Sequence, residues 1–145
     1  ILPSLIEIAE ADDRAARLAA RSIARCGATA GPNEANAAAS FLFEQLDDES
    51  VLFAAADAIV RHGSRFTGVV EKGRALAADA PSGPTTSNRR VAGLCIMASA
   101  GIPLDMMIPR EIEDSARAFL QSLRDDPDPN VRGAAARTSL ALGLP

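Results

Sequence analysis

Residues 125–143 read DDPDPNVRGAAARTSLALG, and this stretch recurs in weaker form three more times along the chain. Each copy opens on an acidic or amide residue, has a small residue eight places before its end, and closes on a glycine. The closing glycines are 36, 38 and 42 residues apart: Gly27, Gly63, Gly101 and Gly143. The small residues are Ala19, Ala55, Gly93 and Ala135. Self-similarity with a period of this size is typical of helical repeat arrays.

The pattern between these landmarks is helical. Apolar residues recur at helical spacing, and alanine is the most frequent of them. No stretch alternates between apolar and polar residues for long enough to predict a β-strand. We therefore expect an all-α fold, a right-handed α-α superhelix (solenoid) of about four antiparallel helix pairs. One domain over residues 1–145 would hold repeats at about 1–27, 33–63, 64–101 and 110–143. Stacked pairs would bury the apolar stripe that one pair cannot cover alone.

The repeat pattern also makes local predictions. The closing glycines should be left-handed helix C-caps, a conformation that glycine adopts without strain. Ala19, Ala55 and Ala135 should be buried where the two helices of a pair cross. Residues 80–87 and 101–109, rich in proline, glycine or polar residues, should be irregular connections, the first exposed and the second folded back over its apolar side chains.

Composition and charge indicate the cellular environment of the protein. The chain has 145 residues, a formal net charge of −4 and only two cysteines, which favours a reducing, intracellular and cytoplasmic environment. No apolar run approaches the ~20 residues that cross a bilayer, so no membrane partner is expected. The first residue is Ile1, not methionine, which predicts a segment of a longer protein.

The copy at residues 125–143 resembles the HEAT-repeat family, in the short variant that is similar to bilin-lyase repeats. It has an acidic turn with Pro127, a polar cap at Asn130, the pair Val131–Arg132, an alanine run and a terminal glycine. The resemblance implies an α-solenoid whose concave surface, lined by the second helix of each pair, binds a partner protein. It also implies a ladder between turn aspartates and arginines of neighbouring repeats. The third copy carries Arg90 but lacks the acidic turn, so this ladder is expected to be broken mid-chain.

Signals for catalysis are sparse. His62 is the only histidine, and a dyad with Cys26 or Cys95 is less favoured than a histidine that ends a helix and meets its dipole. Without a second histidine or a calcium-loop spacing, the acidic clusters are interpreted as helix caps. We therefore predict a protein that is not an enzyme and has no metal site and no cofactor.

One charge pattern suggests a binding surface. Arginines three and four residues apart line one helix face, and a further arginine occupies the equivalent position in the next copy: Arg14, Arg17, Arg21, Arg25 and Arg61. The first helices of the first two pairs are instead acidic. We expect a positive strip on the concave side that binds another protein, with an acidic segment as the candidate. The alternative interpretation is a solvated face with ion pairs between repeats.

Two other functions stay open beside a scaffold or adaptor. A bilin-lyase-like HEAT protein would act on a tetrapyrrole or phycobiliprotein. A nucleic-acid-binding module would use the arginines, but the acidic net charge and the absence of tryptophan and tyrosine disfavour it.

Overall fold

The computed structural model describes residues 1–79, 84–101, 110–141 and 143, and every regular element in them is a helix. The all-α prediction is therefore confirmed for this part of the chain. The helices are α1 (Leu2–Ala9), α2 (Asp13–Thr29), α3 (Pro32–Gln45), α4 (Leu52–His62), α5 (Val69–Ala77), α6 (Pro84–Gly101), α7 (Arg110–Ser122) and α8 (Pro129–Ala141).

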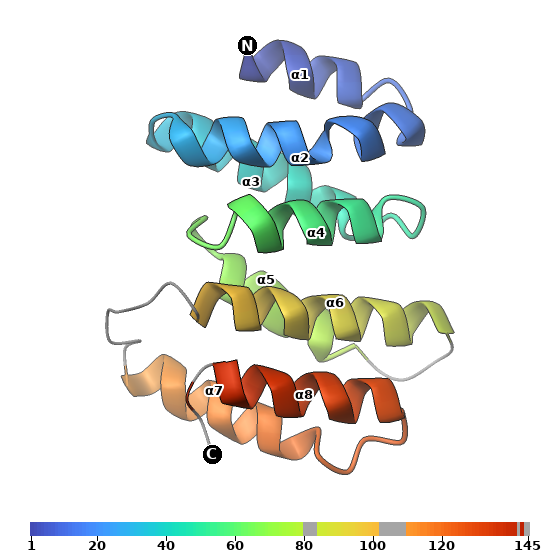
Figure 1. Cartoon of the computed structure of the whole chain (residues 1–145), viewed down its shortest axis with the longest axis vertical. Coiled ribbons are helices and arrows are strands. Elements are labelled where there is room, and N and C mark those ends of the chain that lie inside the picture. Colours follow the sequence, from blue (N-terminus) through green and yellow to red (C-terminus); the bar gives the residue numbers. More distant parts are fainter. Residues whose placement is uncertain (80–83, 102–109, 142, 144–145) are drawn as a thin grey trace. The chain divides into compact units, whose positions relative to one another are not determined.

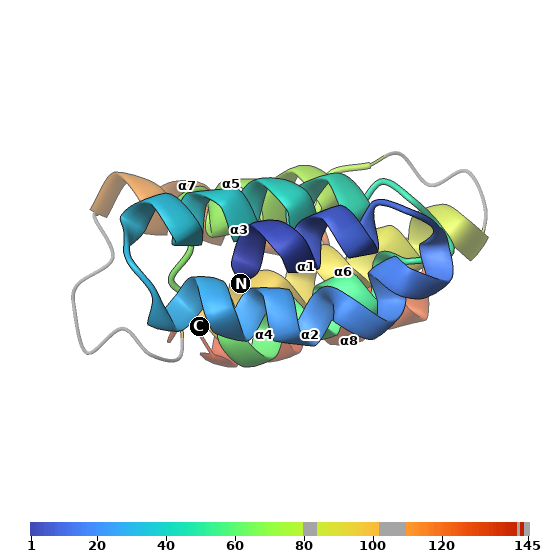
Figure 2. The ribbon, with the colours of Figure 1, turned by 90° about the horizontal axis from the view of Figure 1, so that it is seen from above.

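The chain divides into two compact units, Ile1–Val69 and Val70–Pro145. In the first unit α2 lies beside α4, while α1 and α3 pack behind them as a second layer (Figures 1 and 2). The face of α2 that enters this core carries small and apolar residues at helical spacing: Ala16, Ala20, Ile23, Ala24 and Gly27. Small side chains on this face let the two layers approach closely.

In the second unit α6 lies beside α8, and α7 packs against α8. Its buried cluster draws on α5, α6, α7, the turn after α7, and α8: Ala77, Leu94, Met97, Leu120, Leu123, Val131, Ala134 and Ala135. Helices α5 and α6 touch backbone to backbone, because a Cβ added to Gly93 would lie 2.3 Å from the carbonyl oxygen of Gly73. Glycine is required at this crossing for lack of space.

The glycine-cap prediction is wrong at Gly27 and Gly63 and confirmed at Gly143, while Gly101 is the last residue of α6. Gly27 lies inside α2, which continues to Thr29, and a Cβ there would lie 2.4 Å from that of Ala38. This glycine serves helix packing and does not end the helix. Gly63 does cap α4, but with φ −103°. Gly143 has the expected left-handed backbone, with φ +68°.

The buried-alanine prediction is confirmed at Ala55 and Ala135, whose exposed fractions are 0% and 1%. It is wrong at Ala19, which is half-buried, while Ala16 and Ala20 are buried. Counting eight residues back from Gly27 selects the wrong alanine, because α2 does not end at Gly27.

The predicted connection at residues 80–87 is too long, because α6 begins at Pro84. The rest of that connection, residues 80–83, lies outside the described residues. So do residues 102–109 of the second predicted connection.

Candidate functional site

The arginines predicted to form a binding strip are all exposed, four on α2 and one on α4: Arg14, Arg17, Arg21, Arg25 and Arg61. Asp12 fixes the start of α2, since its Oδ1 accepts a hydrogen bond from the backbone N–H of Ala15 at 2.7 Å. Because the opposite face of α2 is buried, the arginines project toward solvent. We call these five residues the arginine strip.

Asp57 joins the two helices of the strip. Its Oδ2 lies 2.7 Å from Nη2 of Arg21 on α2, and its Oδ1 lies 2.8 Å from Nε of Arg61 on α4. The hydrogen bonds from Arg21 and then from Arg61 hold the pKa of Asp57 below its ordinary value. One carboxylate thus pairs with two of the five arginines and offsets one positive charge, as the alternative interpretation of the strip expected.

Arg17 meets the turn that leads into α4. Its Nη1 donates to the carbonyl oxygen of Ser50 at 3.2 Å. The hydroxyl oxygen of Ser50 lies 2.5 Å from Asp13 Oδ2 and 2.8 Å from Asp48 Oδ1, so the two carboxylates share its single proton. These Ser50 contacts lower the pKa of Asp48, with the side-chain hydrogen bond as the largest cause. The first turn of α2 is therefore tied to the next helix pair.

The other two arginines stand apart. Within the described residues, the side chains of Arg14 and Arg25 make no hydrogen bond or ion pair. Both are exposed and retain their full charge toward solvent. The structure thus brings Arg17, Arg21 and Arg61 together across α2 and α4, and leaves the ends of the strip unpaired.

Sequence reasoning missed the apolar part of this surface. Leu18 on α2 is 74% exposed, and Phe53 on α4 is 59% exposed. Leu18 is at helical spacing from Arg14 and Arg21, so it shares their face. A leucine in the polar stripe of an amphipathic helix was the available signal. Interfaces between proteins are enriched in arginine and aromatic residues, which suits this mixed surface.

His62 lines a cavity of about 420 Å³ at the carboxyl ends of α2 and α4, with Arg65 and Phe66 among its neighbours. Cys26 is half-buried, Cys95 is exposed, and both are free thiols. Among the described residues no three His, Cys, Asp or Glu side chains are placed to hold a metal ion.

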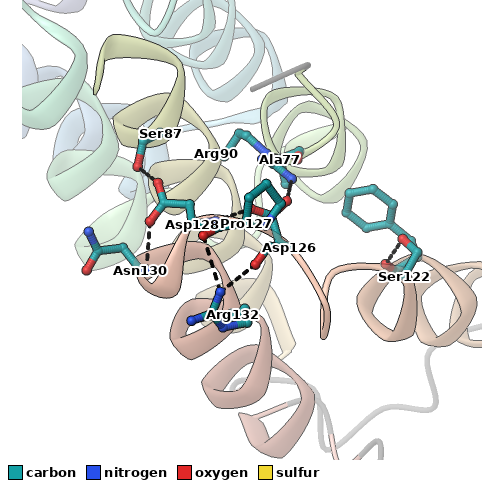
Figure 3. A network of polar contacts seen from close by, with 10 residues as sticks. Ala77, Ser87, Arg90, Ser122, Asp126, Pro127, Asp128, Asn130 and Arg132 are labelled. Carbon is teal, nitrogen blue, oxygen red and sulfur yellow. Dashed lines mark hydrogen bonds and ion pairs between the residues drawn. The ribbon is translucent and has the colours of Figure 1, made fainter. Parts of the chain in front are cut away.

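A second polar network lies in the other unit (Figure 3). Arg90 of α6 pairs with Asp126 in the turn before α8, and Arg132 donates to the carbonyl oxygen of Asp126 at 2.6 Å. Ser87 donates to Asp128, whose pKa this bond lowers most, followed by the backbone N–H of Asn130. The network fastens α6 to the first turn of α8. The Arg90–Asp126 pair joins the third and fourth copies, and the expected break between the second and third copies stays a prediction.

No protein-family model, no curated protein and no solved structure matches the chain. In the part of the chain that the structure describes, none of the helices is both long and apolar enough to cross a bilayer.

Proposed function

We propose that the chain is a protein-interaction module built from HEAT-like helix pairs, and that the α2–α4 face of its first unit binds the partner. The exposed Leu18 and Phe53 beside the arginine strip carry this proposal. Exposed large apolar side chains that share a face with charged anchors are a feature of docking surfaces. The partner segment would combine carboxylates with apolar side chains.

The repeat family enters the proposal through two features. Each unit places the second helices of successive copies side by side, α2 with α4 and α6 with α8. The Arg90–Asp126 pair joins the arginine of one copy to the turn aspartate of the next, as the HEAT resemblance implies. Both features support a right-handed solenoid of HEAT-like pairs as the architecture of the module.

Partner chemistry follows from the charges. Arg14 and Arg25 would attract carboxylates from a distance and speed association through electrostatic steering. A nucleic acid is a poorer match, because the chain has no tryptophan or tyrosine to stack on bases and carries a net charge of −4. The free thiols of Cys26 and Cys95 support an intracellular, cytoplasmic setting.

A labelled 20-residue amphipathic peptide of Glu and Leu tests the proposal, with fluorescence anisotropy as the readout. Arg17→Glu with Arg21→Glu should weaken binding at least about tenfold, which corresponds to about 1.4 kcal/mol. The matched control is Arg124→Glu with Arg137→Glu, which makes the same change of charge at exposed arginines outside the strip.

Leu18→Ser and Phe53→Ser separate an apolar contact from simple charge attraction, and each should weaken binding of the peptide. If the strip double variant and the control double variant lost affinity for the peptide equally, the net charge of the protein would explain the binding. An oligonucleotide that displaces the peptide at equal concentration would favour the nucleic-acid function instead.

A further inference from the structure

A groove opens on the other layer of the first unit, between α1 and the start of α3. It has a volume of about 420 Å³. Leu2, Ile6 and Ala37 contribute its apolar lining, and Glu7, Glu10 and Glu34 stand around it. Leu2 is buried, Ile6 is half-buried, and the three glutamates are exposed. The site therefore offers an apolar floor beneath a ring of carboxylates.

The charged residues of α1 and α3 are all acidic. Helices α1 and α3 contain Glu7, Glu34 and Glu44 and no lysine or arginine. Within the described residues, the side chains of Glu7, Glu10 and Glu34 make no ion pair or hydrogen bond. Three carboxylates without cationic partners repel one another, so a bound cation would relieve the repulsion as well as add attraction.

We propose that this groove binds a cationic amphipathic helix of a partner protein. A leucine-sized side chain of that helix would enter the groove and cover Leu2 and Ile6. Lysines or arginines one turn to either side would reach the glutamates. This is the helix-in-groove mode, in which apolar anchors give affinity and the flanking charges select the partner. Its partner chemistry is opposite to that of the arginine strip, so the two surfaces would recognise different segments.

The probe is a labelled 18-residue peptide of Lys and Leu whose leucines recur at helical spacing. Its control is a scrambled peptide of equal composition without an apolar face. The ordered peptide should bind the chain at least tenfold more tightly than the scrambled one. Its affinity should fall as salt rises from 50 to 300 mM, because exposed charges are screened more strongly.

Two variants address the groove itself. Glu7→Gln with Glu34→Gln should weaken binding of the ordered peptide at least tenfold. Glu44→Gln with Glu71→Gln removes the same charge from exposed positions outside the groove and should change it less than threefold. Ala37→Arg fills the groove from an exposed position, so the helix should fold normally and binding should be lost.

Four results would overturn the proposal. Equal affinity for ordered and scrambled peptides would mean that only charge is recognised. Equal weakening by the two glutamate pairs would place the attraction in the general field of the protein. Peptide-induced NMR shifts on α2 and α4 instead of α1 and α3 would move the site, and sedimentation of the free chain as a dimer through this groove would make a second copy its occupant.

Discussion

Arg90 and Asp126 form an ion pair inside the second unit, with their side chains only 5% and 6% exposed. Nε of Arg90 also donates to the carbonyl oxygen of Ala77 at 3.1 Å, so one guanidinium links α5, α6 and the turn before α8. Its Nη1 has no hydrogen-bond partner among the described residues. A buried guanidinium is costly to desolvate, and Asp126 supplies the charge that offsets this cost.

Removing Asp126 should therefore be severe. Asp126→Ala leaves Arg90 buried without a counter-charge and also removes the acceptor for the backbone N–H of Asp128. We expect a loss of about 3–5 kcal/mol in the free energy of unfolding, measured with urea. Asp125→Ala is the matched control, because Asp125 is the exposed neighbour and should change stability by less than about 0.5 kcal/mol. Similar losses in both would show that the turn, not the ion pair, matters.

Two glycines in neighbouring helices should respond in opposite ways to alanine. At Gly93 an added Cβ would lie 2.3 Å from Gly73 O and 2.7 Å from Ala77 N, and these backbone atoms cannot move aside cheaply. Gly93→Ala should cost about 1–3 kcal/mol by overpacking. At Gly133 the nearest atom is the flexible tip of Arg137 at 3.4 Å, so Gly133→Ala should stabilise α8 by about 0.5–1 kcal/mol. Thermal melting of both variants checks the pair, and a stable Gly93→Ala protein would refute the close approach of α5 and α6.

Acid should destabilise the fold in a defined window. The pKa values of Asp48, Asp57 and Asp128 are lowered in the folded protein, chiefly by hydrogen bonds from Ser50, Arg21 and Ser87. A lowered folded pKa gives stability that is fully present above the ordinary aspartate pKa of about 3.9 and is lost as the pH falls through the lower folded value.

The urea midpoint should accordingly fall as the pH drops below about 4, the ordinary aspartate value. Asp57→Asn should make this fall shallower, because one of the three carboxylates no longer titrates. A midpoint that holds from pH 6 to pH 2.5 would contradict the assignment.

The sequence predicted the helices better than their exact packing. The repeat pattern predicted about four helix pairs, and the described residues form eight helices, but α2 continues past Gly27, which packs against Ala38. A packing glycine and a capping glycine look alike in one sequence. This ambiguity moved the expected buried position to Ala19, whereas Ala16 and Ala20 are buried.

The repeat spacing predicts the ion pairs between successive copies only in part. Arg90 and Asp126 are 36 residues apart, as are Arg21 and Asp57. That separation equals the spacing of Gly27 and Gly63, so the repeat period contained the Arg21–Asp57 pair; Gly101 and Gly143 are 42 residues apart, so it did not contain the Arg90–Asp126 pair. The Arg90–Asp126 pair does not need the acidic turn that the third copy lacks. It joins the arginine of the third copy to the aspartate of the fourth.

The exposure of Leu18 and Phe53 was harder to predict. It depends on which residues of α2 and α4 face each other across the contact between the helices. That offset depends on the packing between α2 and α4, which no local sequence pattern reports.

The last prediction concerns Asp57, whose carboxylate pairs with two residues of the arginine strip. Asp57 pairs with both Arg21 and Arg61, so Asp57→Asn should remove one negative charge and leave both arginines without this counter-charge. Affinity for the Glu–Leu peptide should rise several-fold at 50 mM salt, and the gain should shrink at 300 mM because the charges of both arginines are exposed and screened. Stability should fall by less than about 1 kcal/mol, since both ion pairs are largely solvated. Asp114→Asn, at an exposed aspartate in the other unit, makes the same change of charge and should leave the affinity nearly unchanged. An affinity that falls in Asp57→Asn would mean that Asp57 orders the arginines for binding, and a gain of equal size in Asp114→Asn would mean that net charge alone drives association.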